Sequence, residues 1–290
     1  MSAFPPASPD RKNGFVDLHM HTTASDGVSS PAEVLELVRE AKLVSFAVTD
    51  HDSFEGAREM RALLKEDDPE LICGVELSAG ETGEDLHILA YFFENIESAS
   101  DSPLAQALEE FRRKRGERGA RIVERMQELE LPLTMDDVLV ESGASAIGRA
   151  HIAAAMAKSG ASRTYQEAFD KWIGYGRPGY IPKENLRPDH VIRLTHEAGG
   201  VAVLAHPAIN AADKALPRLL GCGLDGVEVY HPANPYYRRQ EYLALTRANN
   251  LLVSGGSDYH GRDDRHGQIG QEKVHAELVE KMRERARQYR

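Results

Sequence analysis

Seven short, mostly apolar runs recur along the chain, and this pattern constrains the fold more than any other feature of the sequence. Turn residues bound the runs, as is typical of buried strands. The runs lie at residues 15–18, 45–49, 71–76, 86–92, 201–205, 226–230 and 251–254. Helical patterns separate most of them, at residues 31–42, 54–65, 188–198, 212–220, 235–249 and 273–289. Strands that alternate with helices predict an α/β fold with a parallel sheet, here closed as a barrel, for which 290 residues suffice.

Two stretches depart from this alternation. The third and fourth strands are joined by residues 77–85, a Gly-rich stretch too short for a helical crossover, so we predict an antiparallel pair there. Residues 102–179 contain four helical patterns and no convincing strand, which predicts a helical insertion that caps the barrel. The predicted domains are therefore a barrel of residues 14–101 and 180–290, the insertion, and a disordered start at residues 1–13.

Side chains that can bind metal ions stand at the end of nearly every predicted strand. Alternate side chains of a strand share a face, so Asp17, His19 and His21 point the same way. The others are Asp50 and His51 after the second strand, Glu76 on the third, His206 and His231 after the fifth and sixth, and Asp258 and His260 after the seventh. His87, near the start of the fourth strand, joins them if that strand runs backwards. Active sites of parallel barrels lie at this carboxyl-terminal rim.

This concentration of polar groups is hard to explain without metal ions. Taken alone, each residue is better explained as an exposed loop group or a hydrogen-bonded core histidine. Gathered at one barrel mouth, they would leave buried charges or unsatisfied polar atoms, which cost free energy. Mixed imidazole and carboxylate ligands suit zinc, manganese or iron better than calcium or magnesium. More than four ligands implies more than one ion, and Glu76 could bridge two of them.

Six short motifs, in order along the chain, carry a resemblance to a known family. They are Asp-Leu-His-Met-His at residues 17–21, Ser-Asp-Gly at 25–27, Thr-Asp-His-Asp at 49–52, Gly-Val-Glu at 74–76, Ala-His-Pro at 205–207 and Ser-Asp-Tyr-His at 257–260. In these motifs the sequence resembles the polymerase and histidinol phosphatase (PHP) family of phosphoesterases. The resemblance implies a distorted seven-stranded barrel, in agreement with the strand count, and two or three divalent ions, with manganese favoured and zinc or iron as alternatives.

The resemblance also implies which residues hold the ions. The three ligand sets are His19, His21, Glu76 and Asp258 for the first ion, Glu76, His87 and His206 for the second, and Asp26, His51 and His260 for the third. By the same resemblance, Glu76 and His206 would hold the attacking water.

Three further stretches, at residues 148–153, 176–183 and 198–207, resemble one branch of that family. This branch is the nucleoside 3',5'-bisphosphate phosphatases, which are related to 5'-to-3' exoribonucleases acting on short RNA. The resemblance implies removal of the 3'-phosphate of a nucleoside 3',5'-bisphosphate, for example adenosine 3',5'-bisphosphate to AMP, by a hydroxide that bridges two ions. Exonucleolytic cleavage of short RNA at the same site is the alternative.

A second phosphate on the substrate, beyond reach of the metal ions, needs cationic side chains. Arg149, Arg177 and Lys183 are the candidates, and Arg149 opens a predicted helix whose N-terminus already favours anions. The alternative for each is a solvated surface cation. His231 matches no general ligand of the family and is expected to contact substrate.

Two other classes of protein are less consistent with the sequence. Amidohydrolases also begin a barrel with a His-x-His pair, but they typically carry a bridging Lys on the fourth strand, and residues 86–92 contain no Lys. A non-catalytic metal module associated with a polymerase is the other alternative. We disfavour it because nothing of polymerase size is attached to the 290 residues.

Charge and composition limit the possible partners. A net charge of −11 argues against broad binding of duplex DNA, although it permits a nucleotide or short RNA substrate. No apolar run reaches 18 residues, so we expect a cytoplasmic protein without membrane association, and no obligate protein partner is evident. Residues 111–125 hold seven Lys or Arg interleaved with Glu, which could guide RNA or simply form a solvated helix face.

Overall fold

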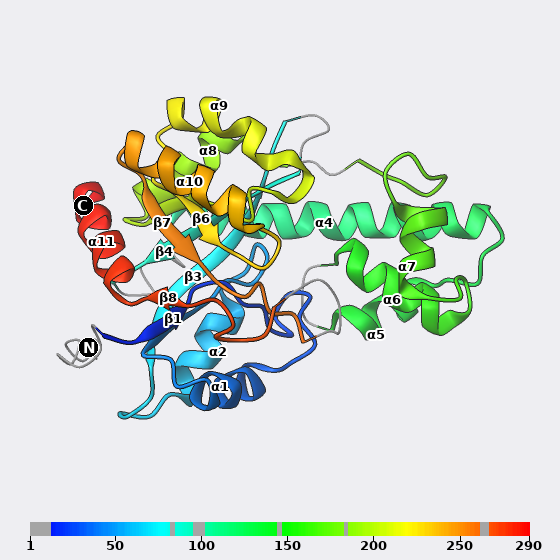
Figure 1. Ribbon diagram of the computed structural model, residues 1–290. Coiled ribbons are helices and arrows are strands. Elements are labelled where there is room, and N and C mark those ends of the chain that lie inside the picture. Colours follow the sequence, from blue (N-terminus) through cyan, green and yellow to red (C-terminus); the bar gives the residue numbers. More distant parts are fainter. Residues whose placement is uncertain (1–12, 82–84, 95–101, 144–146, 183–184, 262–266) are drawn as a thin grey trace. The chain divides into compact units, whose positions relative to one another are not determined.

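Eight strands form one mixed sheet in the computed structural model, which describes residues 13–81, 85–94, 102–143, 147–182, 185–261 and 267–290 (Figure 1). The strands are β1 (Phe15–Asp17), β2 (Ser45–Val48), β3 (Glu70–Ala79), β4 (Leu86–Phe92), β5 (Val201–Leu204), β6 (Gly226–Tyr230), β7 (Leu252–Gly255) and β8 (Val274–His275). Their order in the sheet is β7-β6-β5-β4-β3-β2-β1-β8. All seven predicted strands are present, and β8 is an additional strand that we did not predict.

The sheet nearly closes into a barrel between β1 and β7. The backbone N–H of Leu18 donates to the carbonyl of Gly255 at 3.2 Å, and Met20 forms a parallel bridge with Tyr259 beyond the ends of the two strands. A side chain on Gly256 would collide with the backbone nitrogen of His19, so this approach requires glycine. The result is a barrel-like α/β fold in which the segments after β1 and β7 run side by side.

Strand β4 runs antiparallel to both of its neighbours, β3 and β5. The antiparallel pairing of the third and fourth strands is therefore confirmed. Its register places Ser78 opposite His87. Because of this reversal, the start of β4 lies at the same rim of the barrel as the end of β2 and the middle of β3.

Helices pack outside the strands (Figure 1). The helices that belong to the barrel are α1 (Pro31–Glu40), α2 (Glu55–Leu63), α8 (Pro188–Glu197), α9 (Leu216–Gly221), α10 (Tyr236–Ala248) and α11 (Glu277–Ala286), with short 3₁₀ turns η3 (Ile209–Ala215) and η4 (Arg287–Tyr289). The prediction of one helix over residues 273–289 was wrong at its start. Val274 is fully buried and pairs with Val16, so this stretch is strand β8, and the helix begins only at Glu277.

The chain divides into two compact units, one of Met1–Gln106 with Asn185–Arg290 and one of Ala107–Glu184. The second unit is helical, and its elements are α4 (Pro103–Glu128, which begins in the first unit), α5 (Met135–Ser142), α6 (Arg149–Ser159), α7 (Tyr165–Glu167) and the π-helical η2 (Ala168–Ile173). It has its own apolar core, which includes Ile122, Met126 and Met156. That it caps the barrel stays a prediction. Within the described residues, none of the helices combines the length and apolar character needed to cross a membrane.

Candidate metal centre

One rim of the barrel gathers the side chains that the sequence singled out as metal ligands. Most of them follow the end of a strand, whereas Glu76 lies within β3 and His87 near the start of β4. The nine are His19, His21, Asp26, His51, Glu76, His87, His206, Asp258 and His260, and a chain of contacts of 2.8–3.8 Å joins them all.

Glu76 lies at the centre of this cluster and is 1% exposed. Its Oε2 atom lies 3.3 Å from Nε2 of His19, 3.1 Å from Nε2 of His21 and 3.2 Å from Nδ1 of His51. None of these four atoms makes a hydrogen bond of good geometry. Buried polar atoms without partners are costly, and ligand atoms that converge on one small volume are what a bound cation would satisfy. The residues present therefore fit a metal ion here.

The second oxygen of Glu76 faces a different pair of histidines. Oε1 lies 2.8 Å from Nδ1 of His87 and 2.9 Å from Nε2 of His206, and these two nitrogens are 3.3 Å apart. His87 reaches this position because β4 runs antiparallel to β3. One carboxylate thus presents each of its oxygens to a separate group of imidazoles.

A second buried carboxylate, Asp258, completes the group around His19 and His21. Its Oδ1 atom lies 3.3 Å from Nε2 of each. His19, His21, Glu76 and Asp258 offer ligand atoms that all lie within 4.8 Å of one another. Imidazole and carboxylate donors in this number suit a transition-metal ion.

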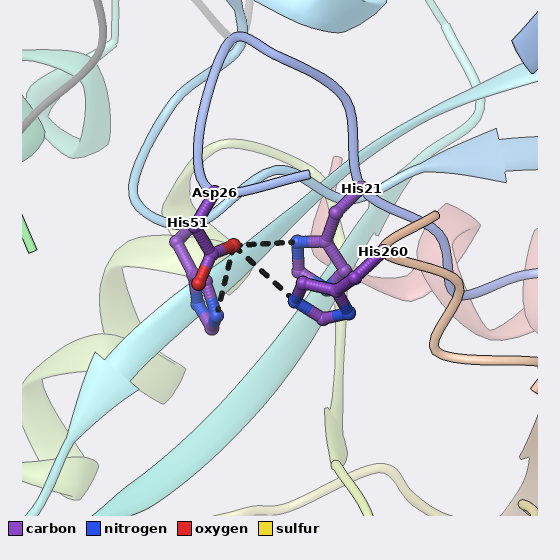
Figure 2. A group of neighbouring side chains, drawn as sticks. All are labelled: His21, Asp26, His51 and His260. Atoms are coloured by element: carbon purple, nitrogen blue, oxygen red, sulfur yellow. Dashed lines mark ion pairs between the residues drawn. The ribbon is translucent and has the colours of Figure 1, made fainter. Parts of the chain in front are cut away.

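Asp26 lies among three further imidazoles, those of His21, His51 and His260, as Figure 2 shows. Its Oδ1 atom faces three imidazoles, at 3.8 Å from Nδ1 of His21, 3.8 Å from Nε2 of His51 and 3.2 Å from Nε2 of His260. In His260, Nδ1 lies 2.9 Å from the carbonyl oxygen of Asp258, to which it can donate its proton. That tautomer leaves Nε2 without a proton and able to bind a metal ion.

Electrostatics within the metal-free cluster show how strongly its charges depend on each other. Burial opposes ionisation of Glu76, but the neighbouring His51 and His87 hold the pKa of its carboxyl well below the usual range. Burial also opposes charge on His21, yet the adjacent carboxylates of Asp258 and Glu76 raise its pKa to about 10. A proton on His21 therefore compensates the buried carboxylates beside it, a role that a metal cation could take over.

The sequence interpretation missed Glu228, which lies on β6 and is fully buried. Its Oε1 atom lies 2.8 Å from Nδ1 of His19, and its Oε2 atom accepts the backbone N–H of His206 at 2.7 Å. When Glu228 accepts the proton on Nδ1 of His19, Nε2 of that ring carries no proton. Nε2 then faces Glu76 and Asp258 and can bind a metal ion. The available signal was a single charged residue inside an otherwise apolar strand.

Two carboxylates that the sequence placed at strand ends hold loops instead of joining the cluster. Asp50 accepts the backbone N–H of Thr22 at 2.8 Å and the hydroxyl of Ser25 at 2.6 Å, which fixes the loop that carries Asp26. Asp17 accepts the backbone N–H of Ser257 at 2.9 Å, in the loop that carries Asp258. Both carboxylates therefore fix loops that carry candidate ligands, Asp26 in one loop and Asp258 in the other.

The backbone around the cluster is strained at two of its members. His206 and Asp258 have φ values of 25° and 53°, which the backbone of residues other than glycine rarely adopts. Each such residue costs roughly 1–3 kcal/mol and persists only where its surroundings enforce it. This strain at two candidate ligands is consistent with a functional site.

The predicted substrate contacts fall in two places. His231 lies in the metal cluster, with Nε2 at 3.3 Å from Oδ2 of Asp258 and Nδ1 accepting the backbone N–H of Ala233. Arg149 and Arg177 belong to the helical unit, where Arg149 is the first residue of α6 and Arg177 is exposed. Lys183 lies outside the described residues.

Comparisons with known proteins agree with this geometry. The model of the PHP domain matches residues 17–176. The chain is 31% identical over 251 residues to the 5'-3' exoribonuclease Rnm of Salmonella typhimurium, with 84% of each chain covered. It is 28% identical over 262 residues to the 3',5'-nucleoside bisphosphate phosphatase of Chromobacterium violaceum, covering 87% of this chain and 90% of the relative.

A solved structure of a related protein has a similar fold. This protein, from Bifidobacterium adolescentis and described as a metal-dependent phosphoesterase, has a TM-score of 0.81 and 32% identity, with 92% of this chain and 94% of the other covered. The match spans both the barrel and the helical unit. Taken with the domain match and the ligand cluster at the rim, these similarities show that the chain belongs to the PHP domain family.

Proposed function

We propose that the chain is a metal-dependent phosphoesterase that removes the 3'-phosphate of nucleoside 3',5'-bisphosphates. The observation that carries this proposal is the buried carboxylate of Glu76, which offers its two oxygens to two different groups of histidines. Such a carboxylate can be shared between two ions. The name of the Chromobacterium violaceum relative, which covers most of the chain, supports this choice of substrate.

We assign three ligand sets to two or three divalent ions, with manganese preferred and zinc or iron as alternatives. His19, His21, Glu76 and Asp258 would hold the first, Glu76, His87 and His206 the second, and Asp26, His51 and His260 the third. When bound, the ions would lower the pKa of the attacking water and neutralise charge on the phosphate. Glu76 and His206 would position that water, and Glu228 would keep His19 and His206 in place.

Exonucleolytic cleavage of short RNA at the same site is the second candidate. It is favoured by the 31% identity to the exoribonuclease of Salmonella typhimurium, because that relative also matches over 84% of its length. Both activities hydrolyse a phosphoester next to a ribose, so one site can perform both. The enzymatic names of these near full-length relatives also support catalysis over a non-catalytic metal module.

A direct test compares three substrates with the purified chain and manganese: adenosine 3',5'-bisphosphate, an ordinary 5'-mononucleotide and a short RNA. We expect rapid release of phosphate from the bisphosphate, little from the mononucleotide, and more than one metal ion per chain by elemental analysis. Hydrolysis of the mononucleotide at the same rate would contradict the proposed specificity. Less than one ion per chain, with no gain on adding manganese, would contradict the metal-dependent mechanism.

Replacing Arg149 by alanine should lower kcat/KM about tenfold to a hundredfold for substrates that carry a 5'-phosphate. Arg149 opens α6, where its charge adds to the anion preference of the helix N-terminus. A charge-assisted hydrogen bond contributes roughly 1.5–3 kcal/mol, which corresponds to the stated loss. The measurement is the steady-state rate with adenosine 3',5'-bisphosphate and with a nucleoside 3'-monophosphate.

The 3'-monophosphate is the internal control, because it lacks the group that Arg149 would hold. An Arg163→Ala variant provides a matched control, since Arg163 is an exposed arginine of the same helical unit. If Arg149→Ala slowed hydrolysis of both substrates equally, Arg149 would act on the reacting phosphate or on folding, and our assignment would be incorrect.

A further inference from the structure

Helix α4 carries a row of cationic side chains on one face. Lys114, Arg118, Arg121 and Arg125 follow each other at intervals of three or four residues. In a helix this spacing aligns them along the axis, about 4.5–6 Å apart. The row stands out in a chain whose net charge is −11.

Three of these cations, Lys114, Arg118 and Arg121, line a groove of about 230 Å³ within the helical unit. The lining residues are Phe111, Lys114, Arg115, Glu117, Arg118, Arg121 and Pro182. Four of the seven are cations, and Glu117 is the one acid among them. The groove therefore has a mostly positive lining, to which Phe111 and Pro182 add apolar surface.

The segment of residues 178–182 fixes the other side of the groove. Arg118 donates through Nε to the carbonyl of Ile181 at 2.8 Å, and Arg125 donates through Nε to the carbonyl of Pro178 at 3.2 Å. These two bonds tie the segment along α4 over two turns. The groove is thus built by two elements whose relative position is set by hydrogen bonds.

Acidic side chains of α4 neutralise part of the row, and Arg125 pairs with Glu128 at 2.7 Å. Glu117 pairs with Arg113, and Glu110 pairs with Arg113 and, at 4.0 Å, with Lys114. Arg121 is exposed and makes no ion pair with any residue that the structure describes. Its charge is available to an external anion.

Aromatic rings accompany the cations in the same unit. Tyr175 is 78% exposed and makes an edge contact with Tyr180, whose ring lies 5.9 Å from the guanidinium of Arg149. The guanidinium of Arg115 lies close to Gly148, at the start of α6. Cations that track a backbone, together with exposed rings on which bases can stack, are the features of surfaces that bind single-stranded nucleic acid.

We propose that the groove along α4 binds the sugar-phosphate backbone of single-stranded RNA. The spacing of the cations along the helix matches a repeating polyanion better than a single phosphate. This inference rests on the second activity proposed above, cleavage of short RNA, because it concerns the nucleotides that follow the one being hydrolysed. The groove would make the chain bind a long RNA strand more tightly than a short nucleotide that carries few phosphates.

The test measures RNA affinity of the full chain loaded with manganese. A 3'-labelled RNA decamer with phosphorothioate linkages, which resist hydrolysis, is titrated by fluorescence anisotropy at several salt concentrations. The protein variants are Lys114→Ala/Arg121→Ala and, as a control in the same unit, Arg163→Ala. Alanine favours helix, and circular dichroism with thermal melting checks that each variant is folded.

The double variant should bind the decamer about tenfold or more weakly. Each lost phosphate contact reduces the slope of log affinity against log salt by about 0.7 for a single strand, so two reduce it by about 1.4. Arg163→Ala should change neither quantity. The unmodified chain should bind the decamer more tightly than a dinucleotide.

Three results would overturn the inference. Equal affinity of all variants would show that the groove does not contact RNA, and equal affinity for decamer and dinucleotide would indicate a site for one phosphate. Competition by poly-glutamate as effective as by unlabelled RNA would identify the groove as a site for acidic peptides. Hydrolysis of adenosine 3',5'-bisphosphate by the unmodified chain is measured separately, so loss of the inference alone is distinguishable from failure of the proposed function.

Discussion

Replacing Glu76 by glutamine should lower kcat/KM by more than about a hundredfold, whereas Asp26→Asn should cost clearly less. Residues that only orient a metal ligand already contribute about tenfold to a hundredfold. Glu76 is placed to bind directly, and each of its oxygens faces a separate group of imidazoles. Asp26 faces one group through a single oxygen and is partly exposed. Steady-state kinetics with adenosine 3',5'-bisphosphate gives the comparison.

The metal content of the Glu76→Gln variant tests whether lost metal binding is the reason for its lower activity. Glutamine keeps the shape of the side chain but loses the charge and one strong donor, so elemental analysis should show fewer ions per chain than for Asp26→Asn. Glu59→Gln is the matched control, because Glu59 is an exposed acid on α2 and its substitution should change neither activity nor metal content. If Glu76→Gln and Asp26→Asn had equal effects, Glu76 would not be shared between ions.

The rim of the barrel could be predicted from the sequence because its signals are local. Apolar strands are short and well bounded, and His19, His51 and His206 lie two or three residues beyond the strand ends. The reversal of β4 could be predicted because no helix fits into its connection to β3. That one inference brought His87 to Glu76, although the two residues lie on different strands.

Other features could not be predicted because they depend on contacts between distant segments. Glu228 is a single charged residue in an otherwise apolar strand, but no local pattern identifies its partner, because its bond to His19 spans 209 positions. Strand β8 has only two residues, too few for an alternating pattern, and Val274 becomes strand through its partner Val16. The positive φ of His206 is likewise imposed by tertiary structure, since histidine itself does not favour it.

Removing the metal ions with a chelator should abolish hydrolysis, and manganese should restore it with release of protons. In the metal-free cluster, burial opposes the charge of His21, but the adjacent carboxylates of Asp258 and Glu76 raise its pKa to about 10. The pKa of His19 is also raised well above its usual value, against the effect of burial, by the charges of Glu228 and Asp258. Both rings therefore carry an extra proton at neutral pH, and each must lose it to bind an ion.

Calorimetry of manganese binding in buffers of different ionisation enthalpy measures these protons directly. At neutral pH we expect at least two protons released per chain, and an apparent affinity that increases as pH rises toward 10. Binding without proton release, or affinity independent of pH, would show that His19 and His21 are not ligands. Restoration of activity by magnesium alone, and not by manganese, would contradict the choice of metal.

The same pKa shifts predict how the metal-free protein responds to pH. His21 has a folded pKa of about 10, above its ordinary value of 6.5, so its contribution to stability is complete below 6.5 and is lost as pH rises through 10. His19 acts in the same direction. The melting temperature of the chelated protein should therefore fall across this range. The melting temperature of the manganese-loaded protein should not fall in this pH range, because the bound ions replace the protons as counter-charges to Glu76 and Asp258. An equal fall in both forms would show that no such replacement occurs.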